Sequence, residues 1–315
     1  MGNERIAMKE VLIVYYSQTG QLTRILERIS ETLKDEQVSL RWARLQPETP
    51  FPFPWDKKSF FGVFPETFLQ KTIPLAPMDD SVFQKKYDLV ILGYQVWYLT
   101  PSLPINSFLK SKAAARLLKD TPVITVNASR NMWTQAQEKV KQLLSGLHAN
   151  LVGNIVLVDR HINHVSVITI VHWMFSGKKD RKWGVFPKPG VSETDIEQAS
   201  RFGGTIKKFL LKSDFSDLQP ALLKQGAVTV KPFLVLADQR ANILFGKWAH
   251  LIAKKGSSGS SKRDKWLVFF NYYLLFAIWI IAPLVFIVFL VSYIPRYHSI
   301  KNQKRYYASV KTKHI

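Results

Sequence analysis

The chain of 315 residues contains no cysteine. This absence excludes disulfides, zinc or iron–sulfur sites built on cysteine, and a thiol nucleophile. Any redox chemistry would therefore depend on a bound organic cofactor. Three histidines, His161, His164 and His172, lie close in sequence but have no compact set of carboxylates beside them, so we predict no metal site.

Acidic residues are scarce. The chain has 44 Lys and Arg against 23 Asp and Glu, which gives a net charge of +21. Residues 216–315 hold 15 of the basic residues and only three acidic ones. Such a basic tail could bind nucleic acid. The apolar run inside it, however, indicates that the positive charge faces the anionic headgroups of membrane lipid. We therefore predict a membrane partner and no nucleic acid.

Residues 266–295 include no charged side chain, and this run exceeds the roughly 20 residues that cross a bilayer. Aromatic residues and basic clusters at both ends are typical of membrane interfaces. We predict one transmembrane helix here, with Pro283 allowing a kinked or re-entrant path. The alternatives are a helix buried in a soluble core and a monotopic insertion that keeps both basic clusters on one side.

The first ten residues are polar and include no apolar signal-peptide core. The sequence thus predicts a single-pass protein of the inner (cytoplasmic) membrane, with its N-terminal domain facing the cytoplasm. We divide the chain into a domain over 1–215, a connector and basic Gly/Ser tether over 216–265, the transmembrane helix over 266–295 and a basic tail over 296–315.

The segment from Val11 to Thr23 joins an apolar run of strand length to a polar turn and a helical pattern. The turn offers hydroxyls, a glycine and the start of a helix, which together are typical of a phosphate-binding loop. Its residues are Ser17, Gln18, Thr19, Gly20, Gln21 and Leu22. No triphosphate-loop lysine and no G-x-G-x-x-G are present, so ATP and Rossmann dinucleotides are not indicated. The alternative is an ordinary helix cap.

Further strands are predicted over 37–45, 88–93, 121–126 and 151–158, with helices between them and a last helix over 192–211. This alternation predicts an α/β fold with a doubly wound, five-stranded parallel sheet, whose ligands bind at the carboxyl ends of the strands. Two more loops reach that edge. They comprise Tyr94, Gln95, Val96, Trp97 and Tyr98, and Asn127, Ala128, Ser129, Arg130, Asn131, Met132 and Trp133.

Aromatic residues in the loop after 93 could stack on a flat ring or simply cover the sheet. Residues 47–77 are rich in proline and aromatics and could form a lid, an apolar substrate wall, core packing or a membrane contact. Farther along, Val228–Leu236 could be a strand, Ile243–Ile252 an amphipathic surface helix and Lys254–Lys262 a flexible tether.

The three loops resemble those of flavodoxin-like FMN proteins, over about residues 10–212. Ser17–Gln21 is similar to the phosphate loop of that family, Tyr94–Tyr98 to its first flavin loop and Asn127–Trp133 to its second. Leu22 departs from the family, which usually has a threonine at this position. The resemblance implies that these residues bind FMN.

More narrowly, the chain is similar to bacterial dialkylresorcinol condensing enzymes, which accompany ketosynthases. The points of likeness are Tyr15–Leu22, Arg130–Trp133, Asn154–Asp159, Ser176–Lys178 and Gly190–Ser192. This likeness implies that FMN oxidises a hydrophobic small molecule, an alkylated cyclohexanedione, to a resorcinol beside a ketosynthase. Arg130 and His161, the latter as proton acceptor, are the candidate catalytic residues.

Two other classes of function stay open. One is an NAD(P)H-dependent quinone reductase or electron-transfer flavodoxin, with NAD(P)H as electron donor. The other is a non-catalytic membrane scaffold that keeps the fold and has lost FMN. Leu22 favours the scaffold, whereas the aromatic loops favour an oxidoreductase.

Overall fold

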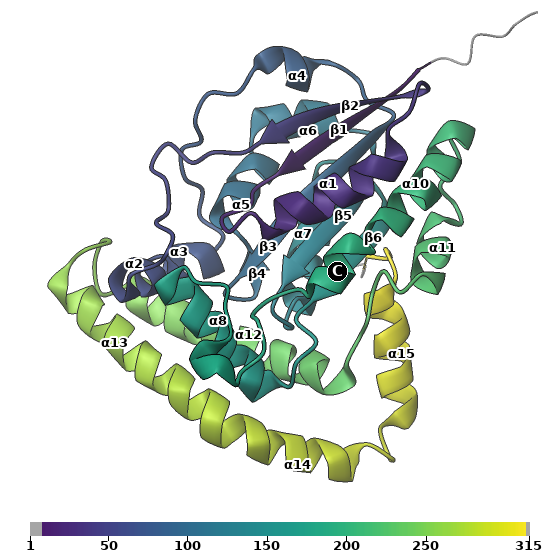
Figure 1. Cartoon of the computed structure of the whole chain (residues 1–315). Helices are drawn as coiled ribbons and strands as arrows, with labels where there is room; N and C mark the ends of the chain where they lie inside the picture. The colour runs from purple at the N-terminus through teal and green to yellow at the C-terminus, as the bar shows by residue number, and fades with distance from the viewer. Residues whose placement is uncertain (1–7, 313–315) are drawn as a thin grey trace, which may run out of the picture.

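A five-stranded parallel sheet organises the protein, and the computed structural model describes residues 8–312 (Figure 1). The strand order is β2-β1-β3-β5-β6, which is the flavodoxin-like order and confirms the predicted fold. A short strand, β4, pairs antiparallel with the end of β3. The strands are β1 (Lys9–Tyr15), β2 (Val38–Arg44), β3 (Leu89–Trp97), β4 (Thr100–Pro101), β5 (Pro122–Ser129) and β6 (Asn150–Val158).

Helices cover both faces of this sheet. One face carries α1 (Gln21–Leu33), α9 (Glu193–Glu197), α10 (Ser200–Lys212) and α11 (Leu218–Lys224). The other carries α4 (Asp80–Gln84), α5 (Leu103–Leu109), α6 (Lys112–Leu118) and α7 (Thr134–Gly146). The helices α1 and α10 approach so closely that a Cβ on Gly203 would lie 1.9 Å from the carbonyl oxygen of Ile29. Two separate cores result, one on each side of the sheet.

Several segments gather at the carboxyl ends of the strands. The insertion over 47–77 forms α2 (Lys57–Gly62) and α3 (Phe64–Phe68). After β6 comes α8 (Asn163–Ser176), followed by the short helix η1 (Lys182–Gly184). The expected last helix over 192–211 is present as α9 and α10, and Ser192 caps α9 by accepting the N–H of Asp195.

The connector is helical where a strand was expected. Residues 228–236 do not form a strand, because Pro232 opens the long helix α12 (Pro232–Ala253) at a position that favours proline. The predicted tether over Lys254–Lys262 forms a turn between α12 and the helix that begins at Ser261, and these two helices pack against each other. Trp248 of α12 lies 5.7 Å, ring centre to ring centre, from Phe270 on the next helix.

The predicted C-terminal apolar helix is present. It runs over Ser261–Ser292, and in the described part of the chain it is the one helix long and apolar enough to cross a membrane. It consists of α13 (Ser261–Phe276), the π-helical segment η2 (Ala277–Ile281) and α14 (Ala282–Ser292). The π segment directly precedes Pro283 and accommodates its missing N–H without breaking the helix.

The last helix, α15 (Tyr297–Ala308), reverses direction. Figure 1 shows α13 and α14 curving beneath the sheet and α15 rising back beside it toward α11 and β6. Tyr307 of α15 is buried against Trp133 and Val156. The basic tail therefore packs on the same domain that carries the sheet.

Candidate functional site

The three predicted loops meet at the carboxyl edge of the sheet. The N–H of Gln18 donates to Oε1 of Gln95 at 3.1 Å, so the loop after β1 is bonded to the one after β3. The N–H of Tyr16 donates to the carbonyl of Gly93 at 3.3 Å. The strand order places the loop after β5 beside them. This edge is where ligands bind in doubly wound sheets.

The turn before α1 has the features of an anion site. Gly20 lies at φ +78°, which exposes the helix start, and the N–H groups of residues 19–23 donate no hydrogen bond within the described chain. Ser17 is fully buried, and its Oγ has no partner among the described residues. The Arg44 guanidinium lies 3.4 Å from the Ser17 carbonyl oxygen. Donors, dipole and cation all suit a phosphate.

The side chains of Gln21 and Leu22 point away from this turn. The Gln21 amide exchanges two hydrogen bonds with the backbone of Val191, at 3.1 and 3.2 Å. Leu22 is buried in the core on the face of the sheet that α1 and α10 cover. Both residues can therefore offer a ligand only their backbone N–H groups.

Tyr94 is a core residue and not a ring against which a cofactor could stack. Its side chain is fully buried in the core on the α5–α7 face, and its hydroxyl donates to Oε1 of Gln137 at 2.5 Å. Burial raises the pKa of this hydroxyl, which stays neutral. The expected aromatic surface must come from other residues of this loop.

The loop after β3 is a tight hairpin that sequence did not predict. Tyr98 and Leu99 occupy its two turn positions at φ +49° and +62°, a backbone that normally requires asparagine or glycine. The Tyr98 hydroxyl donates to the carbonyl of Phe60 at 2.6 Å. Such strain persists only where surrounding contacts hold it, and it is frequent at functional sites.

The aromatic insertion lies over the phosphate loop. The Trp55 indole N–H donates to Gln18 Oε1 at 3.1 Å, and the Gln18 amide donates to the carbonyl of Pro52 at 2.9 Å. Trp97 packs between Phe51 and Trp55, with ring centres 5.0 and 5.6 Å away. Together Trp97, Phe51 and Trp55 form an aromatic wall above the predicted phosphate site.

The loop after β5 contributes polar groups. Ser129 Oγ and Asn131 Oδ1 are buried and have no partner among the described residues. Arg130 Nη1 donates to Asn163 Oδ1 at 2.8 Å, and the Asn131 amide donates to the same oxygen at 3.0 Å. Burial lowers the pKa of Arg130 to about 10, while the nearby Asp159 carboxylate opposes that shift. The guanidinium remains charged at neutral pH.

The other residues of this loop are buried or half-buried. Asn127 and Ala128 are buried in β5, and Met132 is half-buried. Trp133 precedes α7 and packs with Val230 and Tyr307.

Sequence reasoning missed a cluster at the start of α8. Asp159 is fully buried, accepts the backbone N–H of His161 at 3.0 Å and accepts the Ser166 hydroxyl at 2.8 Å. Asn163 anchors the loop after β5. The position of Asp159 directly after a buried strand was the available signal. His161 itself is exposed at this helix start.

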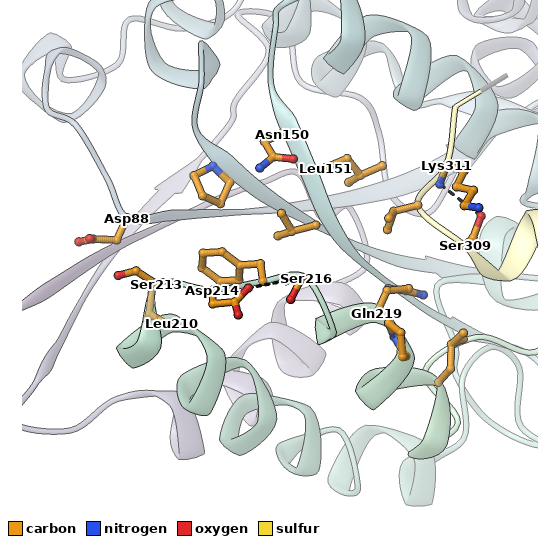
Figure 2. A pocket seen from close by; sticks show the side chains of 16 residues that line it. Asp88, Asn150, Leu151, Leu210, Ser213, Asp214, Ser216, Gln219, Ser309 and Lys311 are labelled. Atoms are coloured by element: carbon orange, nitrogen blue, oxygen red, sulfur yellow. Dashed lines mark hydrogen bonds between the residues drawn. The ribbon is translucent and has the colours of Figure 1, made fainter. Parts of the chain in front are cut away.

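No cluster of three metal-ligating side chains occurs among residues 8–312. The other histidines have separate contacts: His164 Nε2 lies 3.1 Å from the Ile278 carbonyl oxygen, and His172 pairs with Asp180. A hollow of about 840 Å³ is lined by Asp88, Asn150 and Lys311, among others, and Figure 2 shows these side chains. It lies at the amino ends of the strands, opposite the three loops, and is not the candidate site.

No family model and no curated protein matches this chain. Among solved structures, it is similar to a Lactobacillus acidophilus flavoprotein in complex with FMN, at 19% identity over 47% of this chain and 93% of that one, with a TM-score of 0.36. An archaeal flavodoxin is 11% identical over 64% and 98% of the chains, with a TM-score of 0.37. Oxidised flavodoxin from Bacillus cereus is 13% identical over 62% and 95%, with a TM-score of 0.33.

Proposed function

We propose that this protein is an FMN-dependent oxidoreductase held at the inner membrane. The observation that carries the proposal is the buried, unpartnered Ser17 hydroxyl beside the free N–H groups that open α1. An unpaired buried hydroxyl is costly, and a bound phosphate would satisfy it. Two further unpartnered groups, Ser129 Oγ and Asn131 Oδ1, lie in the loop after β5.

In this proposal, Ser17, Thr19 and the backbone N–H groups of residues 19–22 hold the FMN phosphate. The aromatic wall of Trp97, Phe51 and Trp55 shields the ring from water. Arg130 provides a fixed positive charge from the loop after β5, positioned by Asn163. FMN, when bound, supplies two-electron chemistry, and the protein orients it and sets the charge around it.

The substrate proposed is an alkylated cyclohexanedione, as the resemblance to dialkylresorcinol condensing enzymes implies. Its conversion to a resorcinol removes two electrons and two protons, and bound FMN would be the electron acceptor. The apolar helix Ser261–Ser292 would keep the enzyme at the membrane, into which such a lipophilic substrate partitions, with the flavin domain facing the cytoplasm. A ketosynthase is the proposed source of the substrate.

A scaffold without FMN is the competing function, and two observations favour it. Trp55 and Pro52 already bond the Gln18 side chain, so the insertion closes over the phosphate loop without a cofactor. The Leu22 side chain also lies in the core, where the resembled family has a hydroxyl. FMN binding decides between the two functions.

The test is titration of the detergent-purified protein with FMN. Ser17→Ala should weaken binding about tenfold, since one hydrogen bond to a charged group is worth about 1.5 kcal/mol. Because the Ser17 hydroxyl is unpaired without the cofactor, the variant should not lower the unfolding free energy of the apoprotein. Ser30→Ala is the control, since its Oγ already donates to the Leu26 carbonyl at 2.7 Å. Equal FMN affinity in both variants would contradict the assignment.

A further inference from the structure

The apolar helix exposes most of its surface. Over Ser261–Ser292, its buried residues include Leu267, Phe270 and Phe289, which face the domain. Side chains on the other sides stay open, with Phe276 at 55% and Val291 at 78% exposure. Such a continuous apolar surface is far larger than soluble proteins leave in water.

Both ends of this helix are fastened to the same domain. At its start, the Arg263 guanidinium pairs with both carboxylate oxygens of Glu66 on α3. Beyond its end, the buried Tyr307 hydroxyl accepts from the Gln239 amide at 3.0 Å. Gln219 donates to the carbonyl of Ala308 at 2.8 Å.

These attachments conflict with a span across the bilayer. A straight helix of 32 residues is about 48 Å long and would put its two ends on opposite membrane surfaces. Residues 293–296 are the only ones between α14 and α15, and α15 is docked on the domain. The basic tail therefore stays on the side of the domain.

A second apolar surface, on α8, lies beside the apolar helix. The helix α8 buries Ser166, Thr169 and Trp173, and it leaves the aliphatic side chain of Val171 43% exposed. The His164 ring of α8 packs at a tilt of 38° against Trp279 of the apolar helix, with ring centres 5.1 Å apart. In the loop that follows α8, Trp183 is 77% exposed.

Positive charge surrounds both surfaces. Lys178, Arg181 and Lys182 lie next to Trp183 in sequence, and the ends of the apolar helix carry Lys262, Lys265, Arg296 and Lys301. Lysine and arginine at this position attract anionic lipid headgroups, and an exposed tryptophan prefers the interface. Charges of this sign at both places suit contact with an anionic lipid surface.

We propose that the helix Ser261–Ser292 lies in the plane of one anionic leaflet, together with α8, and does not cross the bilayer. This replaces the single-pass arrangement expected from sequence and rests on the membrane association proposed above. Phe64 of the insertion stacks on Phe270 at 3.9 Å, so the leaflet-bound helix contacts the segment that covers the phosphate loop. The carboxyl edge of the sheet then faces the lipid, and a lipophilic substrate can reach the site from the leaflet.

Single-cysteine labelling tests the arrangement in the full chain. The natural chain has no cysteine, so Ser257→Cys before the apolar helix and Asn302→Cys after it each give one label without background. With a membrane-impermeant maleimide, we expect both to react in inverted bacterial membrane vesicles and neither in intact spheroplasts. Labelling of Asn302→Cys only in spheroplasts, with Ser257→Cys only in inverted vesicles, would show a span and overturn the proposal.

Depth measurement gives an independent readout. Spin labels at Val268→Cys, Phe276→Cys and Val291→Cys, in vesicles of phosphatidylethanolamine and phosphatidylglycerol, should all lie at a similar depth of about 5–10 Å. A spanning helix would instead place the Phe276→Cys label near the bilayer centre, about 15 Å deep. Failure to float with these vesicles, or a soluble dimer that buries the labels, would overturn the membrane association itself.

Discussion

The indole N–H of Trp55 donates a 3.1 Å hydrogen bond to Oε1 of Gln18, which connects the aromatic insertion to the predicted phosphate loop. Trp55 also donates its backbone N–H to the Met174 carbonyl at 2.8 Å, so α8 supports the insertion from behind. The sequence of this insertion is compatible with a lid, a substrate wall, core packing or a membrane contact. Its residues cover the loop and also pack on α13.

Removing this cover should speed cofactor release. Trp55→Ala deletes the hydrogen bond and the ring that packs on Trp97, so we expect FMN to dissociate about tenfold faster, a loss of about 1.4 kcal/mol. Recovery of flavin fluorescence on dilution measures the rate. Trp183→Ala is the matched control, because that ring lies on the surface. If both variants release FMN at the wild-type rate, the insertion does not retain the cofactor.

Breaking the buried pair of Glu66 and Arg263 should destabilise the protein. Glu66→Gln leaves the Arg263 charge uncompensated where it is almost fully buried, so we expect a loss of about 3 kcal/mol in unfolding free energy. Asp264→Asn is the control: its partner Lys58 is exposed and 3.5 Å away, so its loss should stay below about 1 kcal/mol. Denaturant titration in detergent compares the two, and equal losses would contradict the prediction.

The same pair predicts an acid sensitivity. Burial raises the pKa of Glu66, but the hydrogen bonds and the charge of Arg263 together lower it by more. The pKa of Glu66 is therefore below its usual value. The carboxylate therefore stabilises the fold above its unfolded pKa of about 4.3, and this stability is lost as pH falls through the folded pKa. Glu66→Gln should flatten this acid limb of the stability curve, and a curve parallel to wild type would argue against it.

Asp238 should act in the opposite sense. Burial raises its pKa to about 6, although Thr134 and Gln135 donate to its Oδ2 at 2.7 and 3.0 Å. With the folded pKa above the unfolded one, stability is highest below about pH 4 and falls as pH rises through about 6, by about 3 kcal/mol. Asp238→Asn keeps an acceptor for both donors and should remove this fall. Unfolding free energies of both proteins across this range measure it, and identical slopes would contradict the assignment.

Arg130 should tune the bound flavin. Reduced FMN carries more negative charge, so a guanidinium nearby favours reduction. Arg130→Met should lower the two-electron midpoint potential by about 30 mV, equivalent to about a tenfold change in the equilibrium. His161→Ala, at an exposed position, should leave the potential unchanged. Spectroelectrochemical titration compares them, and an unshifted potential in Arg130→Met would place this charge away from the ring.

The hypothesis that His161 accepts a proton has its own test. With an alkylated cyclohexanedione as substrate, the hypothesis predicts a slower turnover and an altered pH profile for His161→Ala. Unchanged turnover would exclude this role.

The buried strands and the glycine turn before α1 were predictable from sequence. Parallel strands covered on both faces are continuous apolar runs, as in Val11–Tyr15, and Gly20 marks the turn that follows. The positions of the three loops followed from that alternation. The direction of the side chains within these loops could not be predicted in the same way. Tyr94, for example, lies in the core because the buried part of β3 extends to it.

Elements fixed by long-range packing were not predictable. The β3–β4 hairpin has Tyr98 and Leu99 where turn signals would need glycine or asparagine. The pattern of residues 228–236 fits strand or helix. Helix α12 begins only at Pro232, and Phe233 in its first turn packs against Phe286 and Phe289 of the apolar helix. Docking of α15 depends on Gln219 and Gln239, which are far away in sequence.

The most direct test of the central claim is the visible absorbance spectrum of the detergent-purified full chain, with release and identification of any chromophore. We predict that the wild-type protein shows the spectrum of tightly bound FMN. The same spectrum should be weaker in Ser17→Ala, because less FMN stays bound. A colourless protein that also fails to bind added FMN would contradict the oxidoreductase assignment and leave the flavodoxin-like fold as a membrane scaffold.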